Sequence, residues 1–176
     1  VNGEILTTKN IVVATGARPL VPPIPGIEQV NPLTSDTLWN MRELPKRLVV
    51  VGGGPIGCEL AQTFSRFGSH VTILEGMNRL LLKEDKEVSG AVREKFETEG
   101  ITVLTGHMVE GFKNEHGSKV VTCNCKPDKL NIEADEIIMA LGRKANVTGF
   151  GLEELGVEIR KNGTIEADNF LRTNYP

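Results

Sequence analysis

Three glycines at fixed spacing offer the clearest chemistry in the sequence. Gly52, Gly54 and Gly57 follow the apolar run 47–51 and open a segment with helical periodicity. In such a strand–loop–helix unit the first glycine permits a tight turn, the second lets backbone N–H groups approach a pyrophosphate, and the third lets helix and strand pack closely. The helix N-terminus adds a partial positive charge for the phosphates. The spacing predicts a dinucleotide site; the alternative is a glycine turn without a ligand.

An acidic residue stands where such a site needs one. Glu75 ends the next predicted strand, 21 residues after Gly54, close to the roughly 20 expected for an acid that binds the adenosine ribose. Its carboxylate can accept hydrogen bonds from both ribose hydroxyls and would repel a 2′-phosphate. Glu75, with Gly rather than Ala at position 57, predicts NAD(H) in preference to NADP(H). Arg79 and Lys83 nearby keep NADP(H) as an alternative.

The three cysteines and three histidines form no recognisable catalytic or metal-binding set. Cys123 and Cys125 would share one face of a strand but have no third ligand close by in sequence, so we expect small strand residues rather than half of a metal site. Cys58 directly follows the glycine loop. A thiol with a lowered pKa could sense oxidants there, although a packed helix cysteine is the commoner case. No histidine has a partnered Ser, Cys or Asp at a catalytic spacing.

The glycine loop needs a sheet and helices to hold it, and the hydrophobic pattern predicts them. Buried parallel strands are predicted at 47–51, 70–75, 101–104 and 136–141, and amphipathic helices at 56–67 and 85–99. An antiparallel β-meander is predicted from strands at 109–112, 120–125 and 130–132, with turns at 114–118 and 126–129. The expected fold is α/β: a Rossmann-like βαβαβ parallel sheet with an antiparallel β-meander, in three layers.

The flanking segments have weaker patterns. Before the glycine loop we expect strands at 5–8 and 10–14, a turn at 15–19, and a proline-rich linker over 19–45 with at most one short helix near 34–41. After the last sheet strand we expect a short helix at 152–155 and a strand at 164–167.

Composition excludes several classes of protein. Hydrophobic residues make up 39% and charged residues 24% of the 176 residues, which is globular rather than disordered. No apolar run is long enough for a membrane span and no basic-then-apolar leader opens the sequence, so a membrane partner is not expected. The net charge of −3 and the lack of a basic stripe argue against nucleic acid. An odd cysteine count without Cys-x-x-Cys favours a reducing, cytoplasmic location.

Three segments resemble motifs of the pyridine nucleotide–disulfide oxidoreductases, flavoproteins with two dinucleotide sites. Segment 12–19 is similar to their Ala-Thr-Gly-x-x-Pro motif, 51–61 to their NAD(P)H loop, and 134–146 to a third motif that has an Asp, an apolar run and Gly-Arg-x-x-Asn. Within the family the chain is most similar to the mercuric reductase and dihydrolipoamide dehydrogenase branches, and segment 80–85 especially resembles the mercuric reductase branch.

The resemblance implies a role for each matching residue. The pyrophosphate would be held by the glycine loop, which comprises Gly52, Gly53, Gly54, Pro55, Ile56 and Gly57. Glu75 would bind the adenosine ribose, and Val109 would line the adenine. Gly142 would belong to the loop that closes over the nicotinamide half, with Ile56 and Glu59 beside the nicotinamide and the flavin face. Ala140 is also expected to bind the cofactor. Glu59 also has a simpler interpretation, a carboxylate in the first helical turn that interacts with the helix dipole. Thr15 and Gly16 match backbone that touches FAD.

The resemblance also implies what the chain lacks. The family's FAD-binding glycine loop, redox-active cysteine pair and interface domain have no counterpart here, and the sequence starts at Val1 without Met and stops at Pro176. We therefore expect an excised piece: a strip of the FAD domain with a linker at 1–33, the NAD(P)H-binding domain at 34–146 and a second FAD-domain strip at 147–176. FAD and the FAD and interface domains would belong to a homodimeric parent enzyme. This chain would bind NAD(H) as a monomer without turnover. The alternatives are an NADH oxidase or ferredoxin reductase-like flavoprotein, or a regulatory nucleotide-binding module without an enzymatic parent.

Overall fold

The computed structural model describes residues 3–125 and 128–176. The chain divides into two compact units: Pro19–Arg143, and Val1–Arg18 together with Lys144–Pro176. The larger unit contains the sheet, the helices and the glycine loop, so it carries most of the candidate site.

Five parallel strands form the central sheet of the larger unit, in the order β2-β9-β3-β4-β5. Their bounds are Leu33–Thr34 for β2, Arg47–Val51 for β3, His70–Glu75 for β4, Thr102–Thr105 for β5 and Glu136–Met139 for β9. The strands predicted at 47–51 and 70–75 are confirmed. The other two predicted strands are present with shifted ends.

Both faces of this sheet are buried, as the unbroken apolar run of β3 predicts. Leu48 and Val50 belong to the core under the helices, whereas Val49 and Val51 belong to a second core on the opposite face. All four side chains are at most 2% exposed. Because alternate residues point to opposite faces of a strand, β3 is held from two sides, and the loop that follows it starts from a fixed position.

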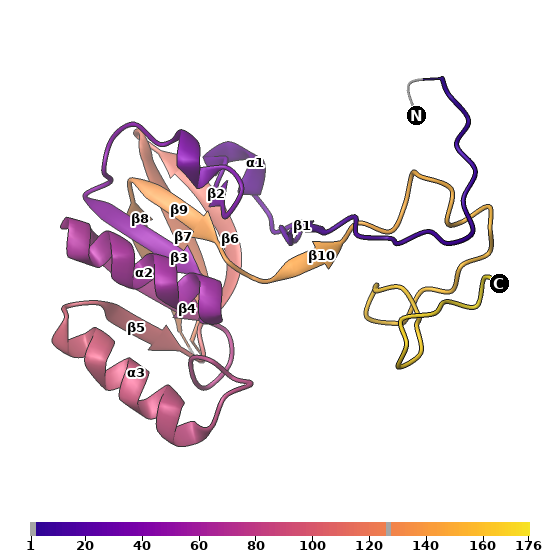
Figure 1. The fold of residues 1–176 in the computed structure, drawn as a ribbon. Helices are drawn as coiled ribbons and strands as arrows, with labels where there is room; N and C mark the ends of the chain where they lie inside the picture. Colours follow the sequence, from indigo (N-terminus) through magenta and orange to yellow (C-terminus); the bar gives the residue numbers. More distant parts are fainter. Residues whose placement is uncertain (1–2, 126–127) are drawn as a thin grey trace. The chain divides into compact units, whose positions relative to one another are not determined.

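Two helices cover one face of the sheet (Figure 1). Helix α2 (Pro55–Phe67) begins with proline, whose fixed φ suits the first helical position, and ends at Gly68 in the left-handed conformation. Helix α3 (Lys86–Thr98) packs Phe96 into the same core as α2. The βαβαβ order of the parallel strands and the two helices confirms the predicted Rossmann-like arrangement.

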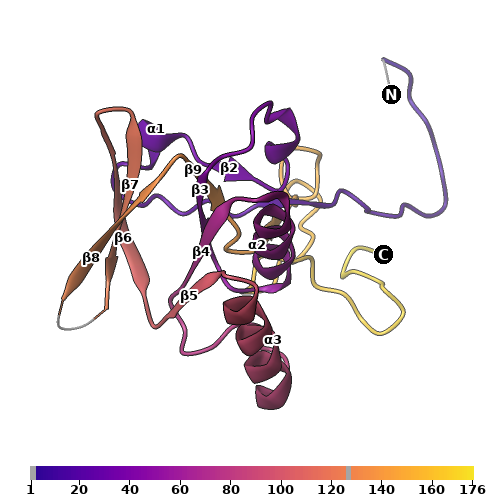
Figure 2. The same cartoon turned by 90° about the vertical axis from the view of Figure 1, so that its left-hand side faces the viewer.

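An antiparallel meander covers the other face, as Figure 2 shows from the side. Its strands are β6 (Met108–Glu115), β7 (Ser118–Asn124) and β8 (Lys129–Ala134). The meander packs Phe112, Val121 and other apolar residues against the second core. Helices, parallel sheet and meander make the three predicted layers. Of the turn predicted at 126–129, residues 126 and 127 lie outside the described part of the chain.

The predicted linker contains structure that the sequence does not reveal. It holds a four-residue helix α1 (Ile27–Val30), the sheet strand β2, and a 3-10 helix η1 (Leu38–Asn40) where a short helix was expected near 34–41. Prolines are compatible with this arrangement because β2 is only two residues long and lies at the edge of the sheet, where few backbone donors are needed.

The smaller unit is mostly irregular, and of the four elements predicted in it three are absent and one is reduced to a single bridge. Residues 5–8 and 10–14 are not strands: Ile5 and Val12 are 90% and 87% exposed, and no sheet partner lies beside them among the described residues. Residues 152–155 form turns rather than a helix. The strand at 164–167 is reduced to one bridge between Ile159 and Ile165. A strand without a hydrogen-bonding neighbour has no energetic support, whatever its propensity.

Two short strands occur where the chain passes between the units. They are β1 (Ala17–Pro19), in place of the turn predicted at 15–19, and β10 (Arg143–Ala145), and they form a two-stranded sheet.

Candidate nucleotide-binding site

A cavity of about 490 Å³ opens at the carboxyl ends of the parallel strands. Its wall is made by residues 52–56 after β3, by Glu75 and Met77 at the end of β4, by 81–84, and by 140–142 after β9. Ligands of open α/β sheets bind at this edge, in the crevice outside the strand ends. The sheet order places β4 on one side of β3 and β9 on the other, so the cavity runs across three neighbouring strands.

Two of the three motif glycines are required by packing. Gly52 has φ of +115°, and a Cβ on it would collide with the carbonyl oxygen of Ala140. A Cβ on Gly57 would collide with the carbonyl oxygen of Gly52. These positions therefore bring strand, helix and neighbouring loop close together, as the predicted roles of the first and third glycine require.

The remaining motif glycine faces open space. Gly54 precedes α2 with φ of −77°, and a Cβ placed on it would meet nothing within 4 Å. No side chain caps the helix here, and the first N–H groups of a helix have no acceptor within the helix. The first intrahelical bond of α2 runs from the Cys58 N–H to the Gly54 carbonyl, at 2.9 Å. The N-terminus of α2 thus presents N–H donors without an acceptor in the helix, next to the open face of Gly54, which fits a pyrophosphate.

Glu75 lies at the other side of the glycine loop, with its half-buried side chain turned toward that loop. One carboxylate oxygen accepts the Gly53 N–H at 2.6 Å and the other accepts the Met77 N–H at 2.7 Å. Each oxygen has a second lone-pair direction, so the carboxylate can still accept hydrogen bonds from two hydroxyls. Glu75 therefore holds the glycine loop and keeps acceptor capacity at the cavity wall.

The chain between β4 and α3 forms a wall that sequence reasoning missed. The Leu81 N–H donates to the Gly53 carbonyl at 2.8 Å, and Arg79 donates to the carbonyls of Leu82 and Glu84, both at 2.7 Å. Leu81 adopts φ of +48°, a strained conformation for a non-glycine residue. The Arg79 guanidinium is thus bonded to the wall itself, while Lys83 lines the cavity. In the sequence, the only sign that this segment would form a wall of the cavity was its closeness to Glu75.

The third wall is the segment after β9. The Ala140 N–H donates to the Val51 carbonyl at 2.8 Å, and the Gly142 carbonyl accepts the Leu20 N–H at 2.9 Å. Gly142 has φ of +109°. Ala140 and Gly142, assigned to the cofactor from the family motif, therefore lie at the cavity together with the glycine loop and Glu75.

Glu59 does not lie in this cavity, and its simpler interpretation is wrong. Because α2 begins at Pro55, Glu59 is in the second helical turn, and the first turn holds no acidic residue. The helix dipole acts mainly within the first turn, so it gives no special stabilisation here. Glu59 instead lines a groove between α2 and α3 with Cys58, Val88 and other residues.

The alternative of Cys58 as an oxidant sensor with a lowered pKa is wrong. Burial, and then the negative charges of Glu75 and Glu59, raise the pKa of the Cys58 thiol to about 11. Its Sγ–H donates to the Gly53 carbonyl at 3.4 Å. A sensing thiol needs a lowered pKa, so Cys58 is a packing residue of α2.

Three further assigned residues are not among those that line the cavity. Val109 is in β6, packed against the core between sheet and meander. Thr15 and Gly16 belong to the smaller unit, where both bond to Asn146. The Thr15 hydroxyl donates to the Asn146 carbonyl at 2.6 Å, and the Asn146 N–H donates to the Gly16 carbonyl at 3.0 Å. Two family motifs, 131 residues apart, are joined at this point.

Among the described residues no group of three or more His, Cys, Asp and Glu could hold a metal ion. Cys123 is fully buried, and the half-buried Cys125 donates to the Asp128 carbonyl at 3.3 Å.

A parallel α/β sheet with a glycine loop, an open helix N-terminus and an acid at the end of the next strand defines the class of nucleotide-binding Rossmann-like domains. Family comparison is more specific. The model of the family described as "Pyridine nucleotide-disulphide oxidoreductase" matches residues 1–176, so the chain belongs to this family.

Two curated relatives show how much of a family protein the chain spans. It is 38% identical over 173 residues to the mercuric reductase of Bacillus cereus. The matched region covers 98% of this chain and 27% of the relative. It is 39% identical over 180 residues to the dihydrolipoyl dehydrogenase of Acholeplasma laidlawii. This matched region covers 100% of this chain and 52% of the relative. The chain therefore spans about a quarter to a half of these relatives.

Solved structures agree with the fold. The HOCl-induced flavoprotein disulfide reductase of Escherichia coli is 31% identical, with a TM-score of 0.80 over 92% of this chain and 36% of that one. The water-forming NADH oxidase of Lactobacillus brevis, bound to NADH, is 27% identical, with a TM-score of 0.80 over 92% of this chain and 36% of that one. An engineered water-forming NADPH oxidase made from it, bound to NADPH, is 26% identical, with the same TM-score and coverage.

Within the described residues, no helix is both long and apolar enough to cross a membrane.

Proposed function

We propose that this chain is the NAD(H)-binding domain of a flavin-dependent pyridine nucleotide–disulfide oxidoreductase. One observation carries the proposal: Gly52 and Gly57 close the loop onto Ala140 and onto each other, while Gly54 alone leaves its face open beside free helix N–H groups. A glycine turn without a ligand would not need that combination. Glu75 then supplies an acceptor for ribose hydroxyls at one end of the same cavity.

In this proposal the chain binds and orients the dinucleotide. The glycine loop, Pro55 and Ile56 hold the pyrophosphate against α2, Glu75 fixes the adenosine ribose, and residues 140–142 border the nicotinamide end. When bound, NADH would supply a hydride to FAD of the parent protein, and the electrons would then reduce a disulfide or another acceptor. The assignments of Val109 to adenine, of Glu59 to the flavin side, and of Thr15 and Gly16 to FAD belong to the same proposal.

We further propose that NAD(H) is preferred over NADP(H). The Glu75 carboxylate would repel a 2′-phosphate, and Arg79, the nearest arginine in sequence, already donates to the carbonyls of Leu82 and Glu84. The comparison with Lactobacillus brevis supports this preference. In the engineered variant bound to NADPH, a glycine and an aspartate that lie 18 positions apart are both replaced by alanine. Gly57 and Glu75 have the same separation here. Lys83 remains the side chain of the wall that could favour NADP(H).

Calorimetric titration of the purified chain tests both proposals. We expect NADH to bind more tightly than NADPH, and Glu75→Ala to weaken NADH binding by about tenfold or more, since hydrogen bonds to a charged group contribute about 1.5–3 kcal/mol each. Glu94→Ala, on the outer surface of α3, is the control and should leave binding unchanged. The site assignment fails if the chain does not bind NADH or if Glu75→Ala binds it normally. Tighter binding of NADPH would refute the preference alone.

One alternative within the family is an NADH oxidase, which the likeness to the Lactobacillus brevis enzyme favours; a ferredoxin reductase-like flavoprotein is a further one. A redox-active cysteine pair encoded upstream in the gene would decide for the disulfide-reducing branch. The alternative from another class is a regulatory nucleotide-binding module with no enzymatic parent. A natural translation start near Val1 would support that module and oppose our proposal.

The remaining proposals concern the organisation of the protein. We propose the NAD(P)H-binding domain at 34–146, with strips of an FAD domain at 1–33 and 147–176, in a cytoplasmic, homodimeric parent. The chain by itself should be a monomer and should not turn over. Light scattering gives its mass: about 19 kDa is expected from the sequence mass of 19.2 kDa, and twice that value would contradict the proposal.

A further inference from the structure

A polar cluster, formed by Ser35, Asp36 and Thr37 after β2, lies beside the end of the cavity that residues 140–142 border. Strands β2 and β9 are parallel neighbours, with Thr34 opposite Met139. The segments that follow them, 35–37 and 140–142, therefore leave the sheet at the same edge. With Glu75 on the β4 side of the glycine loop, a dinucleotide whose ribose reaches Glu75 must extend in the other direction, toward β9. The cluster after β2 is thus next to the proposed nicotinamide end.

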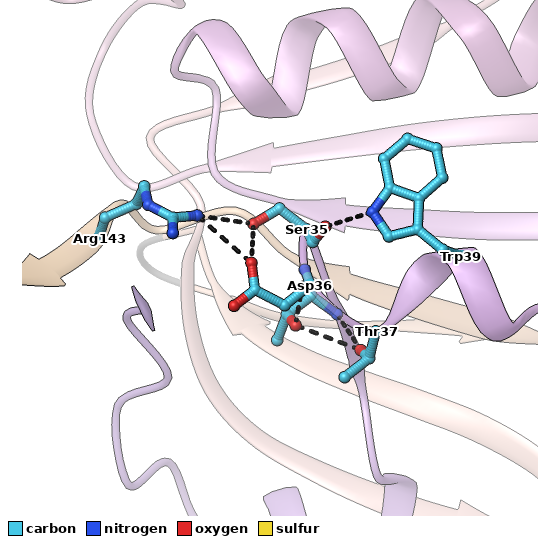
Figure 3. Close-up of polar contacts among 6 residues, drawn as sticks. Ser35, Asp36, Thr37, Trp39 and Arg143 are labelled. Atoms are coloured by element: carbon cyan, nitrogen blue, oxygen red, sulfur yellow. Dashed lines mark hydrogen bonds and ion pairs between the residues drawn. The ribbon is translucent and has the colours of Figure 1, made fainter. Parts of the chain in front are cut away.

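The segment after β2 is a turn held by its own side chains (Figure 3). The Thr37 hydroxyl accepts the Thr34 N–H at 2.9 Å, and the Thr34 carbonyl accepts the Thr37 N–H at 3.1 Å. The indole N–H of Trp39 donates to the Ser35 carbonyl at 2.8 Å. These bonds fix the positions of Ser35 and Asp36 within the turn, which makes it a firm support for another group.

Arg143 reaches this turn from the other segment, as Figure 3 shows. Its Nη1 donates to the Ser35 hydroxyl at 3.2 Å and lies 3.4 Å from an Asp36 carboxylate oxygen. Gly142, directly before it, has φ of +109° and no neighbour within 4 Å of a Cβ position. The side chain of Leu141 is 38% exposed. The backbone at 141–142 is therefore lightly packed, and its position depends on what holds its two ends.

We propose that Arg143 is a positioning residue: by bonding to Ser35 and Asp36 it fixes segment 140–142 at the nicotinamide end of the cavity. The inference rests on the proposed NAD(H) function and adds a residue to it. At its start the segment is held by the Ala140 N–H bond to Val51. At its end it is held by the Leu20 N–H bond to Gly142 and by Arg143. Ser35 and Asp36 follow β2, on the β9 side of the glycine loop, whereas Glu75 ends β4 on the other side. The effect of Arg143 should therefore be confined to the nicotinamide half of the ligand.

The expected loss of affinity follows from the solvent exposure of the ion pair between Arg143 and Asp36. The side chains of Arg143 and Asp36 are 39% and 53% exposed, and an exposed ion pair contributes little because water screens it. The loss of binding free energy cannot exceed the free energy with which the ion pair holds segment 140–142 in place. Removal of the pair should therefore weaken binding by about two- to fivefold, and only for ligands that extend to residues 140–142.

The test compares two ligands by calorimetry. ADP-ribose contains the adenosine, both phosphates and both riboses but lacks the nicotinamide, whereas NADH is complete. Arg143→Gln and Asp36→Asn should each raise the Kd of NADH about two- to fivefold and leave the Kd of ADP-ribose unchanged. The double variant should resemble Arg143→Gln, because that change already removes the ion pair that Asp36→Asn weakens. Arg93→Gln, which removes an ion pair of similar exposure on α3, is the control and should leave both ligands unaffected.

A variant that is merely less stable would weaken both ligands together, so the ratio of the two affinities separates positioning from folding. Unchanged NADH binding in Arg143→Gln, or an equal loss for NADH and ADP-ribose, would overturn the inference while leaving the proposed function intact. Failure of the unsubstituted chain to bind either ligand would instead overturn the proposed function, and this inference with it.

Discussion

Gly54 provides a substitution that should separate ligand binding from stability. Its φ of −77° is allowed for alanine, and the added Cβ would meet nothing within 4 Å of the chain. A glycine-to-alanine change at a compatible position stabilises by about 0.4–1 kcal/mol, because the unfolded chain loses freedom. The same Cβ would project from the face that we assign to the pyrophosphate. Loss of one hydrogen bond to a charged group costs about 1.5–3 kcal/mol, so NADH affinity should fall about ten- to 150-fold.

The assay pairs thermal unfolding with calorimetric NADH titration of Gly54→Ala. The Tm should stay the same or rise by about 1–4 °C, while the Kd of NADH rises at least tenfold. Gly90→Ala is the matched control: Gly90 lies inside α3, its Cβ position is also open, and it is remote from the cavity wall. That variant should gain stability and bind NADH normally. A Gly54→Ala protein that is stable and binds NADH with an unchanged Kd would refute our assignment of the pyrophosphate to this face.

Three further predictions concern the surroundings of the cavity. Gly57→Ala should destabilise the fold by about 1–3 kcal/mol in denaturant unfolding, because its Cβ would meet the Gly52 carbonyl; unchanged stability would contradict the close packing of α2 against the glycine loop. Cys58, with a pKa of about 11, should react only slowly with iodoacetamide at pH 7 in the native protein, and the rate should still be rising at pH 10; a plateau below pH 9 would contradict its burial. The pKa of Glu99 is lowered to about 2 by Arg66 first and then by Gln62. A carboxyl whose pKa is depressed in the folded state contributes its full stabilisation above the unfolded pKa, here near 4.5. The stability difference between the wild type and Glu99→Gln should therefore be constant above pH 5, shrink as pH falls, and be lost as pH passes below about 2. A difference that stays undiminished from pH 5 down to pH 2 would show that the lowered pKa is not the cause.

The central sheet could be predicted because its signal is strong and local. The run 47–51 is apolar at every position except Arg47, as a strand buried on both faces must be, and Gly68 and Gly100 mark helix ends. Strand β2 could not be predicted, since two residues carry no periodicity and the pairing with β9 bridges about a hundred positions in sequence. Segments 5–8 and 10–14 show the opposite failure. Their residues have strand propensity, but propensity does not supply a neighbouring strand.

The candidate site, too, could be predicted from the sequence only in part. The glycine loop and Glu75 were accessible because their spacing reflects a mechanism, namely backbone donors for phosphate and a carboxylate for ribose. The wall at 81–84 was not accessible, because it depends on backbone bonds such as Leu81 to Gly53 and on the φ of +48° at Leu81, which no residue type signals. The start of α2 at Pro55, one residue earlier than expected, was enough to move Glu59 out of the first helical turn.

The central claim is that the glycine loop and Glu75 bind NADH at the carboxyl edge of the sheet. An NMR titration of the ¹⁵N-labelled chain with NADH tests it most directly, because each backbone amide reports separately. We predict that the largest shifts occur at the amides of Gly53, Gly54, Ile56 and Gly57, and that shifts at Leu141 and Gly142 appear with NADH but not with ADP-ribose. Largest shifts in the groove between α2 and α3, around Val88 and Val92, or no shifts at millimolar NADH, would contradict the claim.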